Sequence, residues 1–223
     1  MKNDQLPATA AEKPRRTPWN KGKLVGAKPP LRPSHVWSIR TKLQMEGKKR
    51  DLALFNLAID SKLRGCDVVA VRVDDVVSET RLRHDAPSGY SMDRATIRQK
   101  NEVAPVRFEV TEQTRQAIDE YLRLTGRKAG LFLFAGRDDD GTRGLTTRQY
   151  ARLVQEWVAS IGLDPAKFGT HSLRRTKAVL IYRRTGNLRA VQLLLGHSKI
   201  DSTVRYLGIE VDDAIEIAEK IDI

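Results

Sequence analysis

The feature that most constrains the fold is a helical pattern that begins at Thr146 and runs to the end of the chain. Apolar residues recur there at helical spacing, and glycines interrupt the pattern where helices are expected to end. The helices predicted from this pattern are 147–161, 171–185, 188–195, 202–208 and 211–221. Because the second half of the chain is almost wholly helical, any sheet must be small and must come from the first half.

The first half adds helices and two candidate strand regions. Ser34 is positioned to cap a first helix, and a second helix fits residues 51–63. The β-branched run 68–73 is typical of a strand, and alternating residues around a turn predict a hairpin over 94–110. Thr111 is positioned to cap the next helix. The sequence therefore predicts an α+β fold, mostly helical, with a small antiparallel sheet.

The start of the chain predicts a flexible, basic arm. Residues 1–33 contain six prolines and no helical or strand period. Residues 13–50 hold twelve Lys and Arg against one acid, which accounts for nearly all of the net charge of +12. Such a block indicates either contact with a polyanion, most commonly nucleic acid, or a solubilising tail, and charge alone leaves both open. The residues expected to contact nucleic acid are Arg15, Arg16, Trp19, Lys21, Lys23, Lys48, Lys49 and Arg50.

Composition narrows the class of protein further. Hydrophobic residues make up 40% of the chain, but no apolar run approaches the roughly 20 residues that a membrane span needs. The first 35 residues hold no apolar run that would suggest a signal peptide. The single cysteine, Cys66, allows no intrachain disulfide. We therefore expect a cytoplasmic protein without a membrane partner.

Two histidines, an arginine and a tyrosine stand out in the helical half. His171 and Arg174 are three residues apart at the start of a predicted helix, so their side chains share one side. Gly196 permits the left-handed turn that ends another helix and displays His197 there. Tyr206 follows His197 by nine residues. Each of these residues alone would be an ordinary structural residue, so the evidence for a functional site comes from their combination.

Arg64 and Lys100 complete a set that suits attack on a phosphodiester without a metal. Guanidinium groups neutralise the charge that develops on the phosphate oxygens, and a histidine accepts a proton or donates a hydrogen bond. A tyrosine, with a pKa of about 10, needs such a cationic or basic environment to become a nucleophile. A lysine can protonate the leaving oxygen. The set has no carboxylate pair suited to a metal, so we expect no cofactor.

The set resembles the tyrosine recombinase and integrase family in residue order and in the spacing from His197 to Tyr206. The resemblance runs from about residue 34 to the end of the chain. It implies a mostly helical catalytic domain over 34–223, ending in the helix 211–221, behind the arm 1–33. The residues that correspond to the catalytic set of the family are Arg64, Lys100, His171, Arg174, His197 and Tyr206.

The resemblance also implies a role for each of these residues. Arg64 and Arg174 would bind the scissile phosphate, and His197 would contact it. Lys100 would be the general acid, with a different group in that role as the open alternative, and His171 would transfer protons. Tyr206 would form the 3′-phosphotyrosine bond, ahead of its rivals Tyr90, Tyr121, Tyr150 and Tyr182. Asp67 falls on an acidic position that supports the architecture of the site.

Typical members carry a separate helical domain before the catalytic one, whereas this chain has only the arm there. In this respect it is similar to the short recombinases of fimbrial phase variation, which suggests a bacterial or phage origin. The implied partners are double-stranded DNA and three further copies of the chain in a tetramer. The segment 211–221 would pack either on its own domain or on a neighbouring copy.

The function predicted from these residues is site-specific DNA recombination through a 3′-phosphotyrosine, without metal or ATP. Two other classes stay open. One is a catalytically silent DNA-binding regulator with the same fold. The other is a relaxing topoisomerase that uses the same tyrosine chemistry.

Overall fold

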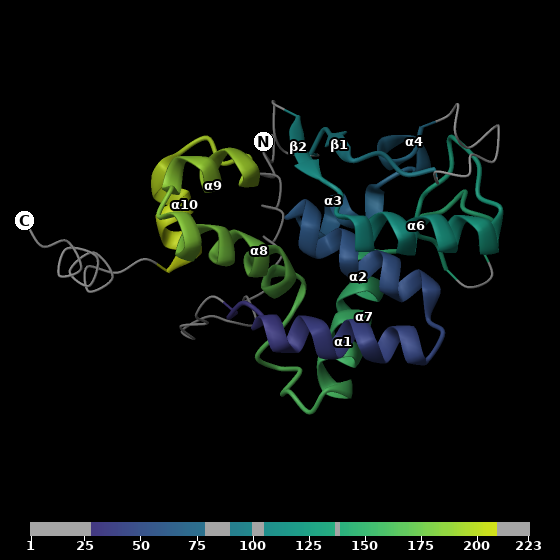
Figure 1. The fold of residues 1–223 in the computed structure, drawn as a ribbon, viewed down its shortest axis with the longest axis horizontal. Coiled ribbons are helices and arrows are strands. Elements are labelled where there is room, and N and C mark those ends of the chain that lie inside the picture. Colours follow the sequence, from purple (N-terminus) through teal and green to yellow (C-terminus); the bar gives the residue numbers. More distant parts are fainter. Residues whose placement is uncertain (1–27, 79–89, 100–104, 137–138, 209–223) are drawn as a thin grey trace, which may run out of the picture.

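The computed structural model of the chain describes residues 28–78, 90–99, 105–136 and 139–208. A helical body carries a small hairpin on one edge and a group of three helices to one side (Figure 1). This arrangement confirms the predicted α+β fold. The elements in chain order are α1 (Pro33–Met45), α2 (Lys49–Ser61), α3 (Gly65–Ala70), α4 (Val73–Val76), β1 (Arg94–Ile97), β2 (Val106–Glu109), α6 (Glu112–Thr125), α7 (Thr147–Ser160), α8 (Thr170–Thr185), α9 (Leu188–Leu195) and α10 (Ile200–Leu207).

α2 forms the centre of the body. Every residue from Asp51 to Ser61 is buried, because α1, α6 and α8 pack around this helix. Leu54, Phe55 and Leu57 are fully enclosed in the main apolar core. A helix that is buried on all sides fixes the position of the next segment of the chain. After α2 that segment is the turn that carries Arg64.

The hairpin predicted over 94–110 is confirmed. β1 and β2 pair antiparallel, with Arg94 opposite Glu109 and Ile97 opposite Val106. Exposed and buried residues alternate along both strands, as expected for a sheet with one face on the core. The predicted tip of the hairpin, with Lys100, lies outside the described residues.

The strand predicted over 68–73 is wrong. Residues Gly65–Ala70 form the short helix α3, and Val68 and Val69 are buried on it. The β-branched run favours a strand locally, but burial against the core and α7 overrides that preference. Within this run only Arg72, which bridges to Phe132, makes a strand-like contact.

Three predicted helix boundaries are also wrong. α1 begins at Pro33 with Arg32 as its N-cap, so Ser34 is already inside the helix, consistent with the preference for proline in a first turn. α2 ends at Ser61, and its C-cap Lys62 adopts the left-handed conformation with φ 54° and is buried. α10 begins at Ile200, two residues before its predicted start.

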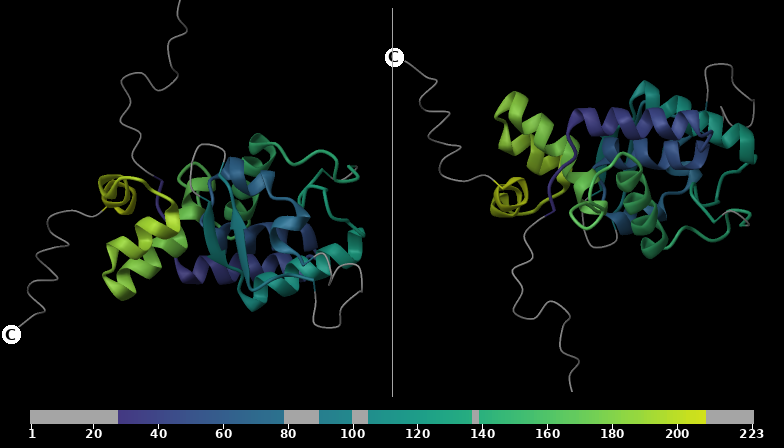
Figure 2. Two further views of the ribbon diagram at one scale, coloured as in Figure 1. Left: turned by 90° about the horizontal axis from the view of Figure 1, so that it is seen from above. Right: turned by 90° about the horizontal axis from the view of Figure 1, so that it is seen from below.

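The group α8, α9 and α10 has a small apolar cluster of its own. Both further views show this group standing beside the main body (Figure 2). It also contacts the body through α8, which packs on α2, and through α9, which packs on β2. The cluster is built from Ala178, Val191 and Leu195, with Ile181, Tyr182, Tyr206 and Leu207 packed against it.

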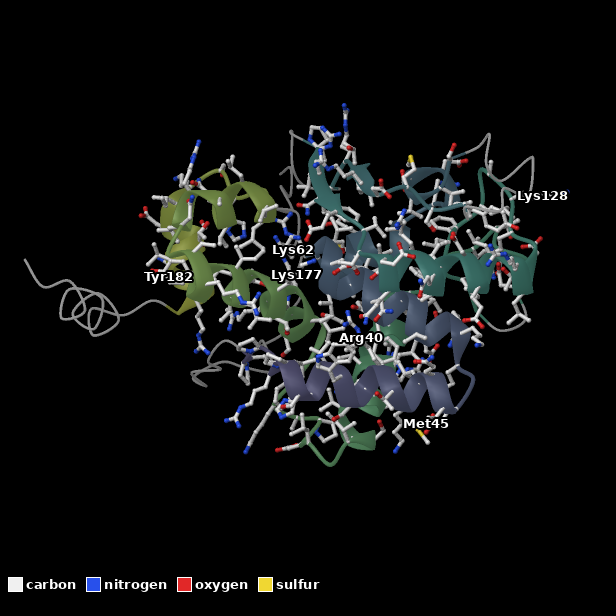
Figure 3. All side chains as sticks on the ribbon, in the orientation of Figure 1. Arg40, Met45, Lys62, Lys128, Lys177 and Tyr182 are labelled. Atoms are coloured by element: carbon white, nitrogen blue, oxygen red, sulfur yellow. The ribbon has the colours of Figure 1, made fainter. Side chains whose placement is uncertain are left out.

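A largely buried network of charges, in which the Glu109 side chain is half-exposed, ties α2, β2 and α8 together. Lys177 Nζ lies 2.8 Å from Asp60 Oδ1 and 2.5 Å from Glu109 Oε1. Lys62 Nζ donates to the Asp60 carbonyl oxygen at 2.6 Å and lies 3.6 Å from Glu109 Oε2. Figure 3 shows Lys62 and Lys177 facing each other between the helices. The network therefore ties together the end of α2, which precedes the turn with Arg64, the end of β2, and α8, which carries Arg174.

The environment of the network sets its charge states. Burial alone would raise the pKa of the Asp60 carboxyl, but the Lys177 ammonium and the Thr111 and Thr114 hydroxyls outweigh it and hold that pKa below its ordinary value. Burial lowers the pKa of Lys62 to about 8, although Glu109 opposes the shift. Lys177 is thus the principal cation that compensates the Asp60 carboxylate.

Replacing Lys177 by Met leaves the buried Asp60 carboxylate without its main cation. We expect the free energy of unfolding to fall by about 3 kcal/mol at pH 7. Because the folded-state pKa of Asp60 lies below its unfolded value, this stabilisation is present above about pH 4, and the difference should shrink as the carboxyl protonates at lower pH.

The matched control is Lys49→Met, which breaks an ion pair with Glu120 whose side chains are 31% and 50% exposed. Chemical denaturation should find a loss of less than about 1 kcal/mol there. Equal losses in the two variants would contradict the importance of the buried network.

Candidate active site

α8 presents its first turn to the rest of the candidate site. His171 lies at the start of the helix, and Arg174 lies one turn later and is 3% exposed. The Arg174 Nη2 group donates to the Leu195 carbonyl oxygen at 2.9 Å, so the arginine is held against the end of α9. Figure 1 shows α8 passing between the main body and α9 and α10. The arginine thus lies where these helices meet.

The turn after α9 depends on Gly196. Its φ of 70° is left-handed, and a Cβ placed on it would lie 2.8 Å from Val106 Cγ2 of β2. Only glycine therefore lets the turn approach the hairpin this closely. His197 comes next, and its Nδ1 lies 3.0 Å from Thr203 Oγ1 of α10, which orients the ring. The Gln192 amide donates to the His197 carbonyl oxygen at 2.9 Å and fixes the backbone there.

Tyr206 on α10 lies among two of the predicted side chains and one that was not predicted. Its ring meets the His197 ring edge to face, with centroids 5.5 Å apart and an interplanar angle of 81°. The guanidinium carbons of Arg174 and Arg175 lie 5.7 Å and 4.7 Å from the Tyr206 ring centroid. These distances are within the range of cation–π attraction.

The Tyr206 hydroxyl is buried and has no hydrogen-bond partner among the described residues. Burial raises the pKa of this phenol, and the charges of Arg174 and Arg175 oppose the rise. Arg175 also faces the hydroxyl, although no hydrogen bond of ordinary geometry joins the two groups. An unpartnered buried hydroxyl next to two guanidinium groups is a place where an anionic group would be accommodated.

Arg64 reaches the same region from the opposite side. It is the N-cap of α3, so it lies in the turn between α2 and α3 and not before a strand as predicted. A Cβ on Gly65 would lie 3.3 Å from the Thr170 side chain, which shows how closely this turn approaches the start of α8. Asp67, predicted to support the site, is 4% exposed in the first turn of α3.

Burial and the surrounding charges both lower the pKa of His171. Partial burial lowers the pKa of its imidazole, and nearby cations lower it further. In decreasing order of effect, these cations are Arg174, Arg175, Arg64 and Lys28. A neutral imidazole near pH 7 can accept a proton.

The other predicted residues fall into two groups, one outside the described residues and one away from this site. Lys100 and the arm residues Arg15, Arg16, Trp19, Lys21 and Lys23 lie outside the described residues. Lys48, Lys49 and Arg50 lie at the junction of α1 and α2, on the far side of the molecule from α9 and α10 (Figure 1). Their cationic groups pair with Glu46, Glu120 and Asp51, respectively.

Sequence reasoning missed Arg175, Lys28 and Gln99. Arg175 comes directly after Arg174, but only the fold shows that its guanidinium lies nearer to the Tyr206 ring. Gln99 is the last described residue before Lys100 and is 2% exposed, and its side-chain oxygen lies 3.7 Å from where a Gly196 Cβ would be. The Gln99 amide nitrogen and oxygen have no hydrogen-bond partner among the described residues.

The arrangement combines a phenol, two histidines and several guanidinium groups, a set suited to binding a phosphate and attacking it. Within the described parts of the chain, no three His, Cys, Asp or Glu side chains are grouped so as to hold a metal ion. The same parts contain no helix long and apolar enough to cross a membrane. The fold and the site together define a helical domain with a cationic site centred on Tyr206.

Comparison with known proteins identifies the family. The model of the phage integrase family matches residues 31–211, so the chain belongs to this family. A probable integrase/recombinase of Bacillus subtilis, YoeC, is 29% identical over 173 residues, which are 78% of this chain and 84% of that protein. Tyrosine recombinase XerC of Neisseria gonorrhoeae is 30% identical over 172 residues, 77% of this chain but only 51% of XerC.

Solved structures support the fold. The crystal structure of XerA recombinase superposes with a TM-score of 0.68 at 17% identity, over 87% of this chain and 66% of that one. XerH site-specific recombinase, in a post-cleavage complex with its difH substrate, gives a TM-score of 0.64 at 18% identity, over 86% and 53%. This chain thus spans about half the length of XerC and of XerH.

Replacing the two buried glutamines Gln99 and Gln192 by Met should affect the free energy of unfolding differently. Gln99→Met removes an amide without a partner among the described residues, so we expect the free energy of unfolding to stay the same or to rise by about 1 kcal/mol. Gln192→Met removes the hydrogen bond to the His197 carbonyl and should cost about 1–3 kcal/mol. Chemical denaturation measures both, and a loss of stability in Gln99→Met as large as in Gln192→Met would contradict this account of the site.

Proposed function

We propose that this chain is a site-specific DNA recombinase in which Tyr206 attacks a DNA phosphate and forms a 3′-phosphotyrosine. The proposal is carried by one observation: the side chains of Arg174, Arg175 and His197 all lie against the Tyr206 ring. Membership of the phage integrase family supports it, as do relatives named as recombinases and solved in complex with DNA. Two guanidinium groups beside a phenol would stabilise the charge of a five-coordinate phosphate.

The proposed reaction exchanges one ester bond for another. The Tyr206 oxygen forms a bond to phosphorus while the bond from phosphorus to the 5′ oxygen breaks. The phenol proton passes to neutral His171, and Lys100 supplies a proton to the leaving 5′ oxygen. Attack by another 5′ hydroxyl reverses these steps on a new strand. Because bond energy is conserved, the proposal requires no ATP, and the side-chain cations take the charge that a metal would otherwise take.

The remaining groups have positioning or binding roles in the proposal. Arg64 and Arg174 would bind the scissile phosphate, and His197, whose ring Thr203 orients, would contact it. Asp67 would support the turn that carries Arg64. The basic residues of the arm and of the α1–α2 junction would contact DNA phosphates.

The proposed domain division is an arm over 1–33 and a catalytic domain over 34–223. Residues 28–33, the end of that arm, lie against α8 and α1 in the structure.

The active form would be a tetramer on two DNA duplexes. The predicted helix 211–221 lies outside the described residues, and it would pack on its own domain or join neighbouring copies. The likeness to the short fimbrial recombinases belongs to this proposal as well.

A nicked suicide substrate, built from the DNA that flanks the gene in its own genome, tests the proposal. The full chain should form a covalent protein–DNA adduct on a denaturing gel, and Tyr206→Phe should form none. Tyr182→Phe is the matched control, because Tyr182 packs in the same apolar cluster, and it should form adduct at the wild-type rate.

Each contrary outcome of this experiment has a definite meaning. Specific DNA binding without adduct would contradict the enzyme and favour the silent regulator. Relaxation of supercoiled DNA of any sequence would instead favour the topoisomerase. Adduct that persists in Tyr206→Phe would show that another residue is the nucleophile.

The rate of adduct formation should depend on pH through His171. Because its pKa lies below the ordinary value of about 6.5, the imidazole is neutral at and above neutral pH and protonates only in more acidic solution. We therefore expect the single-turnover rate to stay high from pH 7 upward and to fall in acid. In His171→Gln this acid limb should disappear, and an unchanged limb in that variant would contradict the role of His171.

A further inference from the structure

The described end of the arm is fastened to α8 and to the loop before it. Lys28 Nζ donates to the Phe168 carbonyl oxygen at 2.8 Å. The Leu31 amide donates to Thr176 Oγ1 of α8 at 3.0 Å, and the Leu31 side chain is 3% exposed within the main core. Figure 2 shows this first described stretch, in purple, running beside the start of α8. We call residues 28–31 the strap.

The strap also fixes the arginine nearest to Tyr206. Arg175 Nη1 donates to the Lys28 carbonyl oxygen at 2.8 Å, while the Arg175 guanidinium carbon lies 4.7 Å from the Tyr206 ring centroid. A guanidinium is planar and rigid, so fixing one of its N–H groups constrains where the others point. The position of Arg175 over the nucleophile therefore depends on a backbone carbonyl of the strap, 147 residues away in sequence.

The Lys28 side chain lies beside the start of α8 as well. A Cβ on Gly169, the N-cap of α8, would lie 3.3 Å from Lys28 Cδ and 3.4 Å from its Nζ. Two residues further along, the Lys28 charge helps to lower the pKa of His171, together with the charges of Arg174, Arg175 and Arg64. The strap thus lies beside the start of α8, which carries the proposed base His171, and contacts Arg175, which lies over the proposed nucleophile Tyr206.

We infer that Lys28 is a positioning residue of the active site and that the strap sets the geometry of Arg175, His171 and Tyr206 for DNA cleavage. The inference rests on the proposed function. Residues that precede the strap carry the basic arm, whose cations include Lys21 and Lys23. A purely structural strap would stabilise the fold without affecting the chemistry.

Lys28→Met tests this inference in the full chain, with Lys167→Met as the matched control. Lys167 is an exposed lysine on the loop just before α8, and its backbone amide, which the substitution keeps, donates to the Asp164 carbonyl oxygen. The readouts are the single-turnover rate of adduct formation at saturating suicide DNA, the Kd for that DNA, and the thermal midpoint. Lys28→Met should lower the rate on the order of tenfold with Kd changed less than about twofold, because misplaced groups cost rate more than binding.

The pH profile distinguishes positioning from stability. Removing the Lys28 charge takes away one of the cations that hold the His171 pKa down, so the acid limb should move to higher pH in Lys28→Met and stay in place in Lys167→Met. Thr176→Val, which removes the acceptor for the Leu31 amide, is the second variant. It should slow adduct formation while the acid limb stays near its wild-type position, because Lys28 keeps its charge.

Three results would overturn the inference. The first is an unchanged rate in both Lys28→Met and Thr176→Val. The second is a loss in Lys28→Met that appears only in Kd, or that Lys167→Met shares equally. The third is a loss that tracks the thermal midpoint alone, without movement of the acid limb. If the proposed function itself fails, wild-type protein forms no adduct, so the two failures are distinguishable.

Discussion

The Lys177 ammonium, held between the Asp60 and Glu109 carboxylates, is the contact on which the arrangement of the site depends. Asp60 is near the end of α2, four residues before Arg64, and Glu109 ends the strand that comes after the predicted position of Lys100. Lys177 lies one turn beyond Arg174 on α8. One set of ion pairs thus sets the mutual positions of α8, which carries Arg174, of the end of α2, which precedes the turn with Arg64, and of the end of β2. Breaking a buried pair is costly, so these elements are held firmly.

Tyr206 is held differently. It belongs to the small cluster of α8, α9 and α10 and not to the main core, and its neighbours are cationic or aromatic. Its buried hydroxyl lacks a partner among the described residues, which is unfavourable in the resting protein. A phosphate bound at Arg174 and Arg175 would supply an acceptor and neutralise their charge. Binding of a phosphate would therefore relieve part of the unfavourable free energy of this arrangement.

The sequence was sufficient to predict the features that depend on local pattern. The alternation in the hairpin, the bounds of the helix 188–195 and the spacing of His171, Arg174, His197 and Tyr206 were all readable from it. It failed where tertiary contacts decide: burial places residues 68–70 in the helix α3 and lets Lys62 take a left-handed conformation that glycine usually supplies. It could not find Arg175 and Lys28 as a pair, because their hydrogen bond spans 147 residues.

The central claim is that Tyr206 becomes covalently bound to DNA. The most direct measurement is mass spectrometry of the trypsin-digested and nuclease-digested adduct. Cleavage after Arg205 and Lys220 releases a peptide over 206–220. The account predicts a nucleotide remnant on this peptide, attached at Tyr206. A remnant on any other residue, or an unmodified 206–220 peptide from a stable protein–DNA adduct, would contradict it.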